Sequence, residues 1–288
     1  MHVILLGTET GLGKQFKRQL EGSLPAGATV EGFGLPDFSV SDRHQVKEVV
    51  DKADWLINCQ QVTEPEAVEG NHDFAYMMNM DGARYVAEAC ARRSIRLVHF
   101  SSAHVYDGMK PKPYTERDLP NPVNKFGASM VAGEKAVRGA GGHYLIIRPG
   151  ALVGEGSGTG PVESALPVLN ADDPLVEVIE DERLSPTHVD ELVDATATLM
   201  RGDQHGLLNV AGQGGCSWLE LYRTMARLMG VEKEFRGVKS SDIRTGVRIP
   251  LNMELETHWY RRWTGKALAD WESVVARVIE ANGLLAQK

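Results

Sequence analysis

The chain has 288 residues, which suits one large domain or a domain with a smaller lobe. Its formal net charge of -8 argues against a nucleic-acid-binding surface. No apolar run approaches the ~20 residues of a membrane span, and the apolar run at the N-terminus is too short for a signal peptide. We therefore expect neither a nucleic acid nor a membrane as a partner.

Three cysteines, Cys59, Cys90 and Cys216, are scattered in apolar contexts. Scattered apolar cysteines are typical of buried free thiols, which persist in a reducing compartment. The sequence therefore predicts a cytoplasmic location. No Cys or His cluster has the spacing of a zinc site, so no metal site is predicted.

The first 150 residues alternate between short apolar runs and helical patterns. Expected strands cover residues 2–6, 28–34, 54–59, 95–102 and 143–150. Expected helices follow the first strand to about residue 20 and then cover residues 42–53, 72–92 and 122–137. Strands that alternate with helices indicate a parallel sheet with right-handed crossovers. The fold class predicted for residues 1–150 is therefore α/β, a Rossmann-type doubly wound parallel sheet that binds a dinucleotide.

The alternation loosens from about residue 151, where Gly and Pro become frequent. Helical patterns near residues 188–201, 217–229 and 267–281 interrupt irregular segments. We expect residues 151–288 to form a smaller mixed lobe of the substrate-binding type, interleaved with the last strands of the sheet.

A glycine turn, Gly7-Thr-Glu-Thr-Gly11-Leu12-Gly13, joins the first strand to its helix. Glycines there allow a tight turn and let a pyrophosphate approach the helix N-terminus. The spacing is G-x-x-x-G-x-G rather than the dinucleotide fingerprint G-x-G-x-x-G. The turn is either only a tight turn or a phosphate-binding loop, and its place at the start of a βαβ pattern favours binding.

The second expected strand should end with a residue that binds the adenosine ribose, acidic for a free 2′-hydroxyl and basic for a 2′-phosphate. This strand ends Gly-Phe-Gly-Leu and supplies neither. Asp37 is the nearest acid, and it either contacts the ribose or caps the following helix. The sequence therefore does not choose between NAD and NADP.

Several segments in order resemble one family of proteins. They are "DWLINCQQVTEPEAVE", "MNMDGARYVAEAC", "VHFSSAHVYDGMKPKPYTERDLPNPVNKFGASMVAGEKAV", "RLSPTHVDELVDA" and "GLLNVAGQGGCSWLELYRTMARLMG". Together they resemble the extended short-chain dehydrogenases/reductases. Within these, the chain resembles dTDP-4-dehydrorhamnose reductases and the regulatory β subunit of methionine adenosyltransferase. The resemblance implies a Rossmann fold with a nucleotide cleft and NAD or NADP as cofactor.

The family's active site combines a Ser or Thr with a Tyr and a Lys. Ser102 matches the Ser/Thr position, whereas Phe126 matches the Tyr and Met130 matches the Lys. The resemblance also implies cofactor contacts, with Asp37 and Phe38 along the adenine. Cys59 and Gln60 match the segment that passes the cofactor. Asn79 matches a structural Asn and is expected among the cofactor-binding residues.

The two replacements remove the groups that carbonyl reduction requires. The Tyr gives the proton, and the Lys lowers the pKa of that Tyr and holds the nicotinamide ribose. Phe has no exchangeable proton, and Met has neither charge nor donor. Loss of a positioned acid costs on the order of 10²–10⁴ in rate. The resemblance therefore implies the cleft, and does not extend the family's activity to this chain.

Four other residues bear on whether the proton donor has moved. His104 is either a substitute acid or a surface or packing residue, and Tyr106 is expected to pack. Lys125 adjoins Phe126, but one step along a helix turns the side chain by about 100°. Arg148 either borders the substrate pocket or forms a buried ion pair.

Two functions remain open from sequence. The first is a non-catalytic nucleotide- or sugar-nucleotide-binding or regulatory protein. The second is an NAD(P)-dependent reductase of a nucleotide-linked keto sugar with a relocated donor. The expected ligand is a nucleotide sugar, and a protein partner or a homo-oligomer is consistent with either function.

Overall fold

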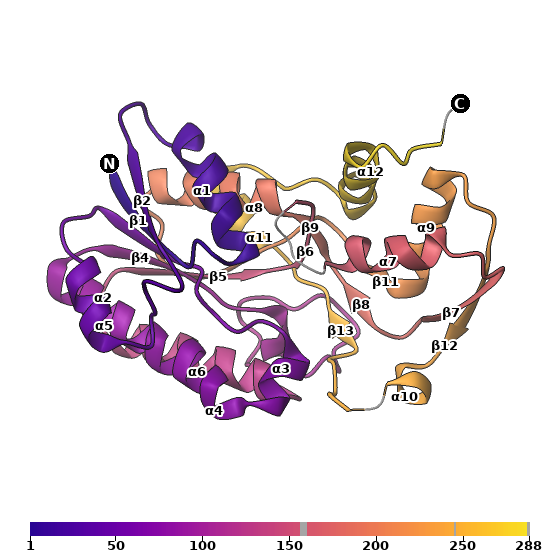
Figure 1. Cartoon of the computed structure of the whole chain (residues 1–288), viewed down its shortest axis with the longest axis horizontal. Coiled ribbons are helices and arrows are strands. Elements are labelled where there is room, and N and C mark those ends of the chain that lie inside the picture. Colours follow the sequence, from indigo (N-terminus) through magenta and orange to yellow (C-terminus); the bar gives the residue numbers. More distant parts are fainter. Residues whose placement is uncertain (156–159, 245, 287–288) are drawn as a thin grey trace.

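The computed structural model describes residues 1–155, 160–244 and 246–286 (Figure 1). Its centre is a six-stranded sheet in the order β10-β5-β4-β3-β1-β2, in which every neighbouring pair is parallel. The strands are β1 (His2–Leu6), β2 (Thr29–Phe33), β3 (Trp55–Asn58), β4 (Arg96–Phe100), β5 (Tyr144–Pro149) and β10 (Gly206–Val210). This arrangement confirms the predicted doubly wound α/β fold. The strand order reverses at β1 and β3, and α/β proteins bind ligands at the carboxyl ends of such strands.

Both faces of the sheet are covered by helices, as β1 shows. Val3 and Leu5 pack into one hydrophobic core, and Ile4 and Leu6 pack into the other. A parallel strand buried on both faces is a continuous apolar run, which explains the sequence of β1. One face carries α1 (Gly11–Ser23), α8 (Val189–Arg201) and α11 (His258–Thr264) (Figure 1). The other carries α2 (Arg43–Val49), α5 (Ala83–Arg93) and α6 (Lys125–Gly139), with α3 (Pro65–Gly70) and α4 (His72–Tyr76) packed against α6.

The helix expected over residues 72–92 is interrupted by a π-helical segment, η1 (Met77–Gly82), between α4 and α5. Asn79 lies in this segment and is fully buried. Its amide nitrogen donates to the Val62 carbonyl (2.9 Å) and to Ser129 Oγ (2.9 Å), and its Oδ1 accepts from the Val62 N–H (2.8 Å). Asn79 therefore joins the loop after β3 to α6, a structural role.

The residues after 150 form smaller sheets beside the main one. These sheets have the orders β11-β8-β13, β12-β7 and β6-β9. Their strands are β6 (Ala151–Val153), β7 (Leu175–Ile179), β8 (Arg183–Leu184), β9 (Pro186–His188), β11 (Cys216–Ser217), β12 (Glu234–Val238) and β13 (Asn252–Met253). The accompanying helices are α7 (Pro161–Asn170), α9 (Trp218–Met229), α10 (Ser240–Ile243) and α12 (Trp271–Ala281). β10 belongs to the main sheet although it follows residue 150 by a long stretch of chain. The division of the chain at residue 150 stays a prediction.

Within the described part of the chain, none of the helices combines the length and the apolar character needed to cross a membrane. All three cysteines are buried and free, as the sequence predicts.

Candidate functional site

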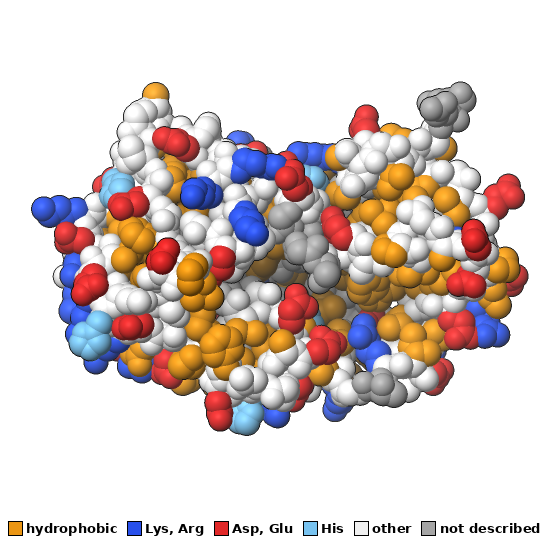
Figure 2. All heavy atoms as spheres, in the orientation of Figure 1, with side chains coloured by type: hydrophobic (Ala, Val, Ile, Leu, Met, Phe, Trp, Pro, Cys, Tyr) orange, Lys and Arg blue, Asp and Glu red, His pale blue; other side chains and the backbone are white. Residues whose placement is uncertain are grey.

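A cavity of about 540 Å³ lies at the carboxyl ends of β1, β3, β4 and β5. The main sheet supplies the segments that follow these strands, and the smaller sheets close the other side through Leu184 and Met253. Figure 2 shows that this face of the molecule is hollowed between the two halves. The cavity therefore lies where the reversal of strand order predicts a ligand site.

The glycine turn at the start of α1 forms one end of this cavity. Gly7 has a φ of +88°, and an added Cβ would come within 2.5 Å of the Gln60 backbone nitrogen. An added Cβ at Gly13 would collide with the Gly7 carbonyl. Thr10 caps the helix by accepting from the Gly13 N–H at 3.0 Å. These glycines are therefore required by chain packing alone.

The same turn nevertheless fits a phosphate. Gly11 and Leu12 open α1 and line the cavity. The first N–H groups of an α-helix have no intrahelical partner, and the helix dipole favours an anion there. The tight packing of this turn is thus compatible with phosphate binding.

The residues assigned to the adenine end lie beyond the cavity lining. Asp37 is exposed and Phe38 is buried. The N-cap of α2 is Asp42, whose carboxylate accepts from the His44 N–H at 2.8 Å, so Asp37 is not that cap. Gln60 is buried among backbone groups of the β2–α2 connection, whereas Cys59 lines the cavity.

Phe126 and Met130 form the opposite end of the cavity, one turn apart on α6. Phe126 is 4% exposed and Met130 is 1% exposed. Asn124 caps α6 by accepting from the Gly127 N–H at 2.7 Å, and an added Cβ at Gly127 would collide with the His104 carbonyl. The first turn of α6 therefore rests on the loop after β4, which brings Phe126 to that loop.

Ser102 and His104 lie on this loop and line the cavity. Ser102 Oγ accepts from the His104 N–H at 3.2 Å. The His104 ring meets the edge of the Phe126 ring, with centroids 5.1 Å apart. Burial, helped by the charge of Arg244, lowers the pKa of His104 to about 4. The imidazole is therefore neutral near pH 7.

Tyr106 belongs to a buried network below the cavity. Its hydroxyl donates to the Thr115 carbonyl at 2.9 Å and accepts from Arg148 Nη1 at 2.6 Å. Its ring stacks on Tyr114, with centroids 4.2 Å apart. Burial raises the pKa of Tyr106 to about 12. Tyr106 is thus a packing residue in the structure, in agreement with the expectation from sequence.

Arg148 forms a buried ion pair with Glu134. Its Nε and Nη2 donate to the two carboxylate oxygens, each at 2.7 Å, and Ser101 Oγ donates to the same carboxylate at 2.6 Å. Both charged side chains are almost fully buried. Of the two interpretations of Arg148, the structure shows the buried ion pair.

The cavity lining offers little acid–base chemistry. The lining residues that the structure describes include no Lys, Arg or Tyr. Their titratable side chains are Cys59, Glu64 and His104, and burial raises the pKa of the Cys59 thiol well above its ordinary value. Lys125 is directed elsewhere, because its Nζ lies 3.2 Å from Glu69 Oε2. In the described chain no cluster of His, Cys, Asp and Glu is arranged to hold a metal ion.

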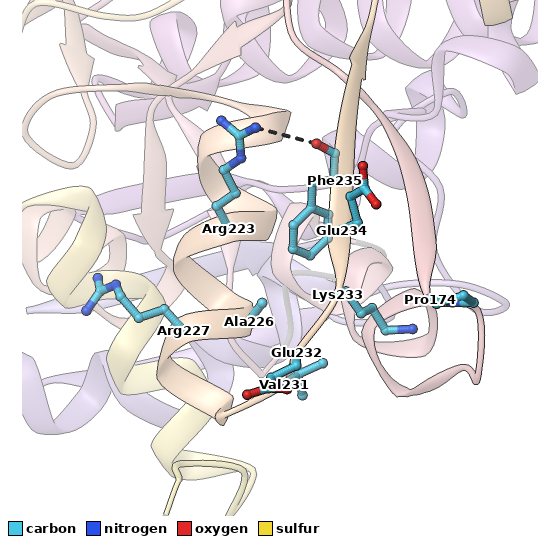
Figure 3. A pocket seen from close by; sticks show the side chains of 9 residues that line it. All are labelled: Pro174, Arg223, Ala226, Arg227, Val231, Glu232, Lys233, Glu234 and Phe235. Carbon is cyan, nitrogen blue, oxygen red and sulfur yellow. Dashed lines mark hydrogen bonds between the residues drawn. The ribbon is translucent and has the colours of Figure 1, made fainter.

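A second hollow, of about 780 Å³, lies between α9 and β12 (Figure 3). Its cationic side chains have partners within the protein. Arg223 donates to the Phe235 carbonyl at 3.4 Å, and Lys233 Nζ donates to the carbonyls of Ala171 and Asp173 at 2.5 and 2.7 Å. This hollow is a surface groove between packed elements and lies on the smaller sheets, away from the glycine turn.

Sequence reasoning overlooked Glu9, an acid inside the glycine turn. Its side chain reaches the end of β2 and accepts from Gln60 Nε2 at 2.7 Å. The signal in the sequence was an acidic residue between Gly7 and Gly11, where a phosphate-binding turn has no need of one.

The fold and the site define a Rossmann-type protein with a nucleotide-sized cleft at the switch point of its sheet. The family model described as "RmlD substrate binding domain" matches residues 1–283, and the chain belongs to this family.

Several of its relatives are named as reductases of dTDP-linked sugars. A dTDP-4-dehydrorhamnose reductase of Sinorhizobium fredii is 26% identical over 285 residues, covering 94% of this chain and 96% of the relative. A dTDP-4-keto-6-deoxy-D-glucose reductase of Streptomyces niveus is 31% identical, covering 73% and 74%. Among solved structures, the dTDP-4-dehydrorhamnose reductase of Bacillus anthracis in complex with NADP is 25% identical, with a TM-score of 0.89 and coverage of 97% and 99%.

Proposed function

We propose that this protein is a non-catalytic member of its reductase family that binds a nucleotide or a nucleotide-linked sugar. The observation that carries the proposal is the apolar end of the cavity. Phe126 and Met130 stand at the positions that the resemblance gives to the catalytic Tyr and Lys, and both are buried. The described lining holds no phenol and no cation that could replace a catalytic Tyr and Lys.

His104, Cys59 and Ser102 are poor proton donors. A nicotinamide cofactor, when bound, supplies hydride, so the protein must supply the proton for the new hydroxyl. His104 is neutral near pH 7 because its pKa is lowered to about 4. The buried Cys59 thiol has a raised pKa, and the Ser102 hydroxyl is a weak acid in the absence of a base or cation beside it.

Ligand binding is supported by the cavity and by the relatives. A cavity of about 540 Å³ lies in the usual range for small-molecule sites. The relatives' names include dTDP-linked keto sugars as substrates and NADP as a bound cofactor. We infer that a pyrimidine-nucleotide sugar is the ligand class of this chain.

Dinucleotide binding is expected to be weak. Gly11 and Leu12 fit a diphosphate at the start of α1, but Met130 has no group to hold the nicotinamide ribose. A submicromolar dissociation constant for NAD or NADP would contradict this part of the proposal.

A second candidate function is reduction by a relocated donor. His104 favours it, because its ring lines the cavity beside Phe126 and its Nδ1 has no hydrogen-bond partner among the described residues. A bound substrate that faced this nitrogen would supply the missing partner.

Calorimetry with dTDP, dTDP-L-rhamnose and NADP⁺ tests the proposal. We expect the dTDP compounds to bind more tightly than NADP⁺. Ala151 lines the cavity, so Ala151→Phe should weaken their binding by about tenfold or more. The exposed Ala171 is the matched control, and Ala171→Phe should leave binding unchanged. Absence of dTDP-compound binding by the unmutated protein would refute the proposal.

A further inference from the structure

Glu9 places a carboxylate at the end of β2. The side chain starts in the glycine turn and lies on the backbone of Gly34, the residue after β2. An added Cβ at Gly34 would collide with Glu9 Oε2, and it would lie 2.7 Å from Thr8 Oγ1. The end of β2, which carries no acid of its own, therefore has one supplied from a neighbouring loop.

Gln60 fixes the position of this carboxylate. Its Oε1 accepts from the Val40 N–H at 2.6 Å, and its Nε2 donates to Glu9 Oε1 at 2.7 Å and to the Phe38 carbonyl at 3.3 Å. Because Val40 offers a backbone donor, the Gln60 oxygen must face Val40 and its nitrogen must face Glu9. The carboxylate is held by a buried side chain that is itself oriented by the backbone.

The second oxygen of Glu9 is buried and has no hydrogen-bond partner among the described residues. Among the described residues, no Lys, Arg or His forms an ion pair with Glu9. A buried carboxylate oxygen without a donor is costly, so native structures usually satisfy it. A ligand hydroxyl at this place would do so.

We propose that Glu9 recognises the adenosine ribose, so that the cleft accepts NAD and rejects NADP. In Rossmann folds the pyrophosphate lies at the N-terminus of the first helix, and an acid at the end of β2 bonds the free 2′-hydroxyl. Glu9 provides that acid from the turn instead of from the strand. A 2′-phosphate would bring up to two further negative charges against a carboxylate that no described cation neutralises.

The inference rests on the proposed function only in taking the cleft to be a nucleotide site. It separates this chain from its Bacillus anthracis relative, which was solved with NADP. It also names Glu9 rather than Asp37, because Gln60 holds the Glu9 carboxylate beside Gly34 at the end of β2, whereas Asp37 is exposed.

Calorimetric titration with NAD⁺ and NADP⁺, each to millimolar concentration, tests the inference. The unmutated protein should bind NAD⁺ about tenfold or more tightly than NADP⁺. Glu9→Gln keeps the shape and removes the charge, and it should reduce that ratio about tenfold, chiefly by improving NADP⁺ binding. Glu31→Gln is the matched control, because it removes one charge from β2 without touching the turn, and it should leave the ratio unchanged.

Several results would overturn the inference. They are equal affinity of the unmutated protein for the two dinucleotides, an unchanged ratio in Glu9→Gln, and a ratio that responds to Asp37→Asn instead. Absence of any dinucleotide binding by both the unmutated protein and Glu9→Gln would also overturn it. That last result leaves the proposed function standing, because dTDP-compound binding tests the latter separately. The ratio for the unmutated protein does not depend on whether any variant folds.

Discussion

The two ends of the cleft have opposite chemistry. At the turn end, Thr10, Glu9 and Gln60 form hydrogen bonds around the start of α1. At the other end, Phe126 and Met130 present carbon and sulfur to the cavity. Both ends are well packed, so the difference is one of polar groups and not of shape.

Under the proposed function, this contrast is how binding persists without reaction in one fold. A binding end needs backbone N–H groups and a few fixed acceptors, which the main sheet positions by its strand order. A reacting end also needs a group that gives up a proton at the working pH. Under the proposed function, the apolar pair Phe126 and Met130 fills that place and keeps the packing.

The largest expected effect comes from introducing the Tyr and Lys that the resemblance places at positions 126 and 130. Phe126→Tyr with Met130→Lys should raise turnover of dTDP-4-dehydrorhamnose by on the order of 10²–10⁴ over the unmutated protein. Phe126→Tyr alone should do less, because its phenol lacks a cation to lower its pKa. Oxidation of NADH and NADPH with the keto sugar is the measurement. Equal rates for the single and double variants would show that the missing Lys is not part of the deficit.

The stability of the protein should depend on the buried ion pair between Arg148 and Glu134. Arg148→Met leaves Glu134 buried without its main partner and should lower the free energy of unfolding by about 3–5 kcal/mol. Urea denaturation measures it. The exposed pair Arg227 and Glu272 gives the control, since Arg227→Met should cost less than about 1 kcal/mol. Similar losses in both variants would contradict the structural role of Arg148.

The neutral His104 should make the stability of the folded protein fall in acid. Its folded pKa of about 4 lies below the ordinary value of 6.5, so the unfolded chain binds more protons between these values. The contribution of the neutral His104 to the free energy of unfolding is therefore complete above pH 6.5 and is lost as the pH falls through 4. His104→Phe should reduce the fall in unfolding free energy between pH 7 and 4.5 by about 1–3 kcal/mol.

The buried His99, whose pKa is also lowered to about 4, contributes equally to both proteins in that comparison. His72 is exposed, and His72→Gln is the surface control. Urea denaturation at the two pH values measures each variant. An unaltered pH dependence in His104→Phe would mean that folding does not lower the pKa of His104.

An effect no larger than that of His104→Phe is expected for Tyr106→Phe. The change removes a hydroxyl that donates to the Thr115 carbonyl and accepts from Arg148, and it should cost about 1–3 kcal/mol of unfolding free energy. Binding of dTDP should be unchanged, because Tyr106 does not line the cavity. A large loss of affinity at unchanged stability would place Tyr106 in the site after all.

The sequence was sufficient to predict the main sheet and its helices, because buried parallel strands are short apolar runs between amphipathic helices. It was less informative where contacts rather than periodicity decide the structure. The helix expected to residue 53 ends at Val49, and the π-helical turn at Asn79 depends on bonds to Val62 and Ser129. The short strands of the smaller sheets are too brief for a periodic pattern.

The same limit applies to the site. The glycine turn and the apolar pair are visible in the sequence, since each is a local feature. Glu9 at the end of β2, held by Gln60, joins residues 51 positions apart, and no spacing rule predicts that contact. Whether His104 lies in the cavity or at the surface likewise required the position of α6.

Turnover by the unmutated protein tests the central claim most directly. NADH and NADPH oxidation would be followed with dTDP-4-dehydrorhamnose at saturating concentration, with Ala151→Phe as the blocked control. The account predicts no oxidation above that of the control, because the described lining holds no Tyr or Lys and its His104 is neutral near pH 7. Clear turnover that is abolished by His104→Ala would contradict it and identify His104 as the relocated donor.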